Sequence, residues 1–191
     1  GIWRGGAHGI NAFFTESFMD ELARMAGVEP LSFRMQMLGG QPRLARCLTT
    51  VTALGDWDGG APGSTQGLAT HSAFGSHIAL LVEAQVGDGG QIAVDRIIAV
   101  VDAGRLIHPD IVLQQIESGI LWGIAAALGS ATGFSGGLAD ARNFDTLGLP
   151  RLATTPEIRI ELIESNEAPG GVSGLGVAPV APAIANALFA A

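Results

Sequence analysis

The sequence predicts an α+β protein, with a helical N-terminal third followed by a mixed β-sheet with packed helices. Apolar residues recur with a helical period up to about residue 55, and β-rich runs replace that pattern further along the chain. Between them, residues 56–67 are rich in Gly, Asp, Pro and Ser, as linkers are. We therefore divide the chain into a helical segment at 1–55, a linker at 56–67 and an α+β segment at 68–191.

Three helices are expected in the first segment. The first covers residues 11–26, where apolar side chains recur every three or four positions and Gly27 follows as a helix terminator. This pattern indicates an amphipathic helix. Residues 30–38 and 42–54 each begin with a proline, which suits the first turn of a helix, so we expect two further helices there.

The α+β segment is expected to begin with a β-hairpin. Residues 77–86 and 91–101 are β-rich, and the glycine-rich stretch 87–90 joins them. Within this stretch, Asp88-Gly89 is a pair that adopts the positive φ angles required by a tight hairpin turn.

The rest of the α+β segment is expected to hold two helices and a strand. A long helix should span 109–128, a strand 155–164, and a last helix should start at about Pro182. Gly119 and Gly123 lie four residues apart on one face of the long helix. Their missing side chains would let another segment pack very closely against it.

Composition excludes several function classes. The chain has 18 acidic and 10 basic residues, and its net charge of −8 argues against a nucleic-acid partner. A single cysteine, Cys47, rules out an intrachain disulfide and a cysteine-ligated iron–sulfur cluster, and we expect it to be inert core. The longest apolar run, 119–128, is shorter than the ~20 residues of a membrane span, so none is expected. The abrupt start at Gly1 indicates a fragment.

One short motif suggests a hydrolase. Residues 133–137 read Gly-Phe-Ser-Gly-Gly, which matches the nucleophile elbow in which a strand precedes the serine and a helix follows it. Here a helix is expected before Ser135, so a glycine-rich turn is favoured. A serine hydrolase is retained as the alternative from a different functional class.

The histidines show no close metal-ligand pairing, and we assign no metal ligand. They are His8, His71, His77 and His108. His71 and His77 would share a face if both lay on one strand, because a six-residue step preserves the side of a strand. That spacing permits a site without specifying one.

Several blocks, taken in order along the chain, resemble a single family. The blocks are Trp3-Arg4-Gly5-Gly6, Val101-Asp102-Ala103-Gly104, Gln115-Ile116-Glu117-Ser118-Gly119, Ala168-Pro169-Gly170-Gly171-Val172 and 181–187. They resemble the molybdenum hydroxylases of the xanthine dehydrogenase and aldehyde oxidase type. Within that family they are most similar to the large subunits of isoquinoline 1-oxidoreductase-like enzymes.

This resemblance implies the C-terminal part of a larger molybdopterin-binding subunit. Such enzymes use a molybdopterin cytosine dinucleotide with molybdenum to oxidise aldehydes or N-heterocycles, with oxygen taken from water. In this branch the electrons pass to 2Fe–2S clusters on a small partner subunit, which agrees with the single cysteine. By resemblance, Arg4 would lie near the substrate and metal. Gln115, Gly5, Gly6 and Ser173 would contact the cofactor.

The resemblance also places a departure at the catalytic position. Where the family has the general-base glutamate of a Val-Gly-Glu-Pro string, this chain reads Val172-Ser173-Gly174-Leu175. Gly174 therefore occupies the place of the base, and a glycine cannot accept a proton through a side chain. Two interpretations stay open: an active hydroxylase subunit, and a catalytically degenerate homologue with a structural role.

Overall fold

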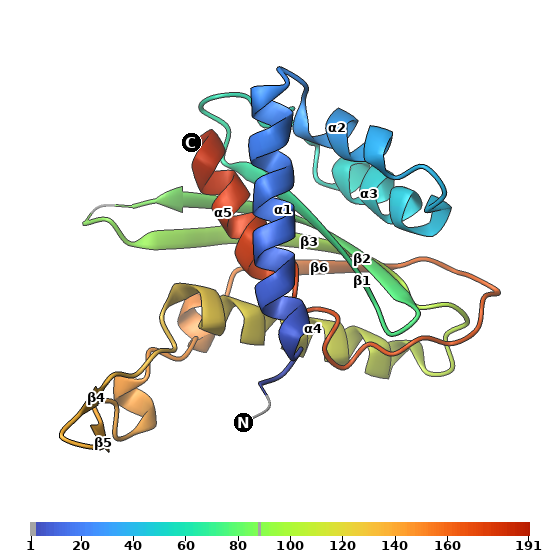
Figure 1. Ribbon diagram of the computed structural model, residues 1–191. Helices are drawn as coiled ribbons and strands as arrows, with labels where there is room; N and C mark the ends of the chain where they lie inside the picture. The colour runs from blue at the N-terminus through green and yellow to red at the C-terminus, as the bar shows by residue number, and fades with distance from the viewer. Residues whose placement is uncertain (1–2, 88) are drawn as a thin grey trace.

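The computed structural model describes residues 3–87 and 89–191, and it has the expected α+β architecture (Figure 1). Four strands form one sheet in the order β1-β2-β3-β6. The first three strands pair in antiparallel fashion, and β6 lies parallel to β3. The larger elements are α1 (Ala7–Met25), α2 (Pro30–Met37), α3 (Pro42–Leu54), β1 (Gln66–Ala73), β2 (Ser76–Val86), β3 (Ile92–Asp102), α4 (Pro109–Leu128), β6 (Glu157–Leu162) and α5 (Val180–Ala190).

The hairpin expected from the sequence is confirmed as β2 and β3, which pair from His77 and Asp102 to Val86 and Ile92, with one irregularity at Glu83/Ala84. Gly89 and Gly90 in the connecting turn both have positive φ. Asp88, the other half of the expected turn pair, lies outside the described residues.

The sequence analysis missed one strand of the four-stranded sheet, as well as the two-residue strands β4 (Phe134–Ser135) and β5 (Leu138–Ala139). β1 begins at Gln66, so the last two residues of the expected linker already belong to the sheet. Its composition, with Gly, Ala, Ser, Thr and His, carries little intrinsic β-preference. The strand form depends instead on tertiary contacts: β1 pairs with β2, and a Cβ on Gly67 would lie 2.2 Å from the carbonyl oxygen of Ala183 in α5.

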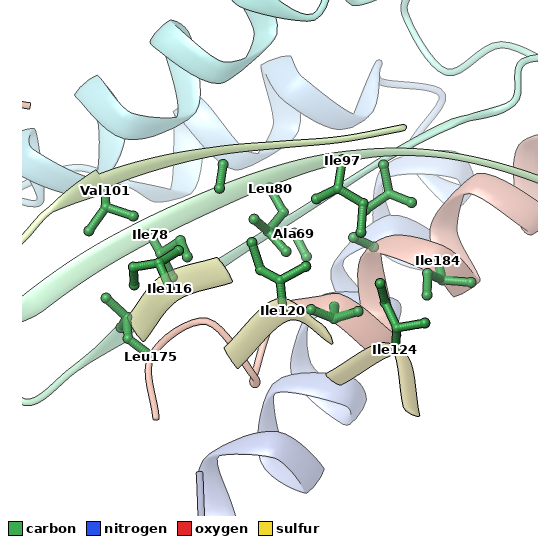
Figure 2. Packing of buried hydrophobic residues seen from close by; sticks show 14 of the residues in the cluster. Ala69, Ile78, Leu80, Ile97, Val101, Ile116, Ile120, Ile124, Leu175 and Ile184 are labelled. Carbon is green, nitrogen blue, oxygen red and sulfur yellow. The ribbon is translucent and has the colours of Figure 1, made fainter. Parts of the chain in front are cut away.

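Alternate residues of the sheet face two separate cores. One core joins the sheet to α4 and α5, and Figure 2 shows Ile116 and Ile120 of α4 pointing toward Ile78 and Leu80 of β2. The other core joins the opposite face of the sheet to α3. Its buried members are Cys47, Leu48, Val51, Leu68, Ala79, Leu81, Ile98, Val100 and Ile163.

Cys47 is fully buried in the second core, as expected. Burial raises the pKa of its thiol to about 12, and the charge of Asp102 adds to this effect. The thiol is therefore protonated at neutral pH, which agrees with an inert core residue.

α1 does not bury its apolar stripe; instead it buries small and acidic residues and leaves the apolar side chains exposed. Its buried residues are Ala12, Ser17, Asp20 and Ala23, whereas Phe14, Phe18 and Met25 are exposed. The physical reason lies in α2, where the buried Arg34 guanidinium donates to the carboxylates of Asp20 (2.7 Å) and Glu16 (3.1 Å). The polar face of α1 therefore turns inward to neutralise a buried cation.

The long helix α4 has the expected bounds. By length and composition it is long and apolar enough to cross a membrane, which the sequence analysis did not anticipate. Soluble core helices pass the same test, and one side of α4 here packs into the sheet core through Ile116, Ile120 and Ile124. Pro109 suits its first turn, and the His108 imidazole accepts a hydrogen bond from the Ile111 amide.

Ser135 does not have the surroundings of a hydrolase nucleophile. It lies at the end of the two-residue strand β4 (Phe134–Ser135), and a tight turn leads into β5 (Leu138–Ala139) rather than into a helix. The side chain is exposed. The strand-turn-helix geometry of a nucleophile elbow is therefore missing at this motif.

Candidate cofactor-binding site

Arg4 connects three segments that are far apart in the sequence. Its Nε donates to the carbonyl oxygen of Ser173 at 2.8 Å, and its Nη1 donates to Oγ of Ser118 at 2.7 Å. Its Nη2 reaches both the carbonyl oxygen (3.2 Å) and Oε1 (3.3 Å) of Gln115. The guanidinium thus fixes the N-terminal loop against α4 and the C-terminal glycine loop.

Two glycines on α4 allow the C-terminal glycine loop to come close to this helix. A Cβ on Gly119 would lie 3.2 Å from Cα of Gly176, and one on Gly123 would lie 2.7 Å from Cγ2 of Val180. The close packing expected for Gly119 and Gly123 is therefore confirmed. It presses the chain after Ser173 against α4, where Gln115 projects one turn earlier.

A cavity of about 430 Å³ lies where these segments meet. All the site residues named from the sequence line it, together with three others that the sequence analysis did not assign to a site. The lining residues are Trp3, Arg4, Gly5, Gly6, His8, Phe74, Gln115, Ser173 and Gly174. The structure therefore brings the sequence-derived candidates together from both ends of the chain and from α4.

Gly5 and Gly174 lie next to each other in the wall of the cavity. A Cβ built on Gly174 would lie 3.1 Å from Cα of Gly5, which is tighter than ordinary side-chain contacts. Gly5 has a φ of +85°, a conformation that favours glycine, whereas Gly174 is outside that region. Bare backbone therefore forms this part of the wall.

His8 is a cavity residue that sequence reasoning missed. It lies in the first turn of α1, and its Nδ1 is 3.1 Å from Nε2 of His71 on β1. Burial lowers the pKa of His71 to about 4, and the neighbouring His8 contributes to the shift. No sequence signal marked it, because the first helix was expected to begin at residue 11 and His8 meets its partner His71 only in the folded chain.

The condition under which His71 and His77 would share a face, that both lie on one strand, is not met. The two histidines lie on different strands, because the chain turns at Phe74-Gly75 between β1 and β2. His77 shares a hydrogen bond with Oγ of Ser72 at 2.7 Å, whereas His71 contacts His8. Among residues 3–87 and 89–191, no group of three or more His, Cys, Asp or Glu side chains is placed to hold a metal ion.

A larger cavity, about 740 Å³, lies beside α3 and the end of β3. Its buried carboxylate, Asp102, receives hydrogen bonds from Nε and Nη2 of Arg43 and from the Gly104 amide. Burial alone would raise the pKa of Asp102, but these hydrogen bonds and the Arg43 charge outweigh it and lower the pKa. The pair ties α3 to the sheet, so we assign Asp102 a structural role.

The smaller cavity has the donors and the charge that an anionic pterin cofactor would need. Every hydrogen-bond acceptor of Arg4 is a neutral oxygen, and none of the described carboxylates forms an ion pair with it. The Gln115 amide nitrogen makes no hydrogen bond within the described part of the chain. An uncompensated guanidinium beside bare glycine backbone fits a phosphate- or oxo-bearing ligand.

Comparison with known proteins identifies the class. A family model described as the molybdopterin cofactor-binding domain matches residues 46–156, which is more than half of the chain. The chain therefore belongs to the molybdopterin cofactor-binding domain family. Gln115 lies inside the matched region, whereas Arg4, Ser173 and Gly174 lie outside it.

Among individual relatives, the chain is 34% identical to the beta chain of isoquinoline 1-oxidoreductase from Brevundimonas diminuta, over 92% of this chain and 23% of that protein. It is 29% identical to a membrane-bound aldehyde dehydrogenase (pyrroloquinoline-quinone) of Gluconacetobacter polyoxogenes, over 95% and 26% of the two chains. It is 28% identical to one of the subunits of the nicotinate dehydrogenase of Pseudomonas putida, over 94% and 17%. The chain thus spans at most about a quarter of the length of these relatives.

Solved structures show the same fold. The carbon monoxide dehydrogenase of Oligotropha carboxidovorans superposes with a TM-score of 0.55 at 22% identity, over 61% of this chain and 15% of that one. The aldehyde oxidoreductase of Desulfovibrio desulfuricans gives 0.53 at 22% identity, over 61% and 13%. At this level of identity the likeness concerns architecture alone.

Proposed function

We propose that this chain is the C-terminal part of the large subunit of a molybdenum hydroxylase that oxidises aldehydes or N-heterocycles. The observation that carries the proposal is the meeting of Arg4, Gln115 and Ser173 at one cavity in a chain of the molybdopterin-binding family. The names of the relatives, an isoquinoline oxidoreductase, an aldehyde dehydrogenase and a nicotinate dehydrogenase, support these two substrate classes.

In this proposal the cofactor is molybdopterin cytosine dinucleotide with molybdenum, which would supply the redox chemistry when bound. One relative carries a different cofactor, pyrroloquinoline-quinone, in its name, but the family that matches this chain is the molybdopterin cofactor-binding domain. The Gln115 amide and the glycine backbone at Gly5 and Gly6 would hold the pterin. Arg4 would hold the anionic end of the ligand or polarise the substrate.

The partner in the proposal is a small subunit with 2Fe–2S clusters that receives the electrons. Two of the relatives are named as single subunits of a larger enzyme, which supports a multi-subunit assembly. The single Cys47 is buried in the α3 core, so it is not available to bind such a cluster.

The test is to express the full-length gene with a small-subunit gene and to measure molybdenum, pterin and iron in the purified complex. We expect near-stoichiometric molybdenum and pterin, bleaching of the iron–sulfur absorbance on anaerobic addition of an aldehyde or N-heterocycle, and ¹⁸O from labelled water in the product. A complex without molybdenum, or a product whose oxygen comes from O₂, would contradict the proposal.

A degenerate homologue is the second candidate, and Gly174 favours it. Without a side chain, position 174 contributes no proton acceptor to the cavity. In that case the complex would assemble and retain its cofactor, but no substrate of either class would bleach the iron–sulfur absorbance.

A further inference from the structure

The cavity described above contains one group suited to accepting a proton. Of the described residues that line it, only Arg4 and His8 carry ionisable side chains. The arginine guanidinium stays protonated at any working pH, whereas an imidazole exchanges its proton in the physiological range. If the chemistry at this cavity uses a proton acceptor from this chain, His8 is the residue in position to serve.

The surroundings of His8 hold its ring by two contacts. Its Nδ1 lies 3.1 Å from Nε2 of His71, and its ring packs against the Phe74 ring in a T-shaped arrangement at a centroid distance of 4.9 Å. Only one of the two facing nitrogens carries the proton of this hydrogen bond. When His8 Nδ1 donates to His71, the lone pair of His8 Nε2 is free to accept a proton.

His71 is suited to the acceptor role in this hydrogen bond. Its pKa is lowered to about 4, first by burial and then by the neighbouring His8, so it is neutral at physiological pH. A neutral His71 can accept the Nδ1–H of His8 both before and after His8 gains a proton. The other charged group at the cavity is Arg4, and the lining residues from α4 and the glycine loop, Gln115, Ser173 and Gly174, are uncharged.

We propose that His8 is the proton acceptor of this cavity, in place of the carboxylate missing at Gly174, and that His71 is its positioning residue. This inference rests on the proposed hydroxylase function. In the step it describes, the O–H bond of the water-derived nucleophile breaks and the electron pair stays on oxygen. The proton forms a new N–H bond at Nε2 of His8, which becomes an imidazolium that still donates from Nδ1 to His71.

Kinetics of the holoenzyme provide the first test. In the full-length complex loaded with cofactor, His8→Gln should lower kcat for the reductive half-reaction by about 10²-fold, the lower end for a positioned base, with little change in KM. It should also remove the ascending limb of the wild-type pH profile. His77→Gln is the matched control, because His77 bonds to Ser72 and does not line the cavity, and it should leave both parameters unchanged.

A pair of substitutions tests the positioning role. His71→Leu removes the hydrogen-bond acceptor and should lower kcat by about 10-fold, as loss of a ring-orienting partner does. His71→Gln keeps an acceptor oxygen and should recover most of the rate. Equal rates for the two variants would show that His71 only fills space.

Diethyl pyrocarbonate provides a readout that does not depend on turnover, because it modifies unprotonated, accessible imidazoles. In the holoenzyme, peptide mass mapping should find His8 modified and His71 protected, with His8 more reactive in His71→Gln than in His71→Leu. An unreactive His8 overturns the proposal whether or not the enzyme turns over. Wild-type turnover by His8→Gln with an unchanged pH profile also overturns it. Failure of wild type to turn over, with His8 reactive, counts against the proposed function instead.

Discussion

The side chain of Arg4 donates to the carbonyl oxygen of Ser173, 169 residues further along the chain, at 2.8 Å. This contact joins the beginning and the end of the described chain at one cavity. It also means that the glycine loop holding Gly174 is fixed by a cation that has no carboxylate partner within residues 3–87 and 89–191. Loss of the guanidinium should therefore affect ligand binding and loop position together.

We predict that Arg4→Lys reduces cofactor retention in the full-length complex by about 10-fold or more, because a single hydrogen bond to a charged group is worth about 1.5–3 kcal/mol. Lysine keeps the charge but cannot reach Ser173, Ser118 and Gln115 at once. Molybdenum per subunit after gel filtration measures the effect. Arg46→Lys, at the separate larger cavity, is the control and should retain wild-type molybdenum. Equal retention in Arg4→Lys would remove Arg4 from the site.

We predict that Gly174→Glu raises the rate of substrate oxidation, by up to about 10²-fold in a His8→Gln background and by less in wild type. The backbone conformation at position 174 accepts a side chain, although the Gly5 loop must move by a few tenths of an ångström. Gly174→Ala carries the same Cβ without a carboxylate, so it separates packing from chemistry. Stopped-flow reduction at matched cofactor loading is the measurement. A glutamate variant no faster than the alanine variant would show that position 174 is not the place of a base.

We predict that Arg34→Met destabilises the protein by about 3–5 kcal/mol, the usual cost of removing one partner from a buried ion pair. The substitution leaves Asp20 and Glu16 without their buried cation. Urea unfolding followed by circular dichroism measures the change. Arg24→Ala removes a looser, partly exposed contact with the same Asp20 at 3.7 Å, so it should cost less than about 1 kcal/mol. Similar losses for the two variants would contradict the importance of burial.

We predict that Cys47 is unreactive toward Ellman's reagent at pH 8 in the folded protein. Its pKa of about 12 and its complete burial leave almost no accessible thiolate. One equivalent of thiol should react once the chain is unfolded in urea. Rapid reaction in the native state would mean that α3 separates readily from the sheet.

We predict that stability falls as the pH decreases from about 6.5 to about 4. Burial and His8 lower the pKa of His71 to about 4, so in this range the unfolded chain binds a proton that the folded chain does not. Above pH 6.5 the imidazole is neutral in both states, and its effect is constant. His71→Gln should flatten this part of the profile. Thermal unfolding of wild type and variant across the pH range is the measurement.

Much of the fold could be predicted from local pattern. The helices at 30–38 and 42–54, the long helix at 109–128 and the β2–β3 hairpin all have strong start signals or turn residues. β1 could not be predicted in this way, because its small and polar residues take strand form only through pairing with β2 and contact with α5. Its pattern carries almost no local signal.

The orientation of α1 and the role of His8 depended on contacts between distant segments. An apolar stripe predicts a buried face, but Arg34 on α2 draws the acidic face of α1 inward instead. His8 gains its position from His71, 63 residues away, and from the cavity that Arg4 organises. No spacing within the sequence indicates either relation, whereas Arg4, Gln115 and Gly174 were accessible through ordered motif blocks.

Two glycines of α4, Gly119 and Gly123, affect the cavity from behind its wall. Neither Gly119 nor Gly123 lines the cavity, yet both pack directly against the chain that follows Ser173. A methyl group at Gly123 would displace Val180 and the start of α5, and with them the wall that carries Ser173. The shape of the cavity thus depends on two positions that act as spacers, so a change of that shape can begin behind the wall as well as on it.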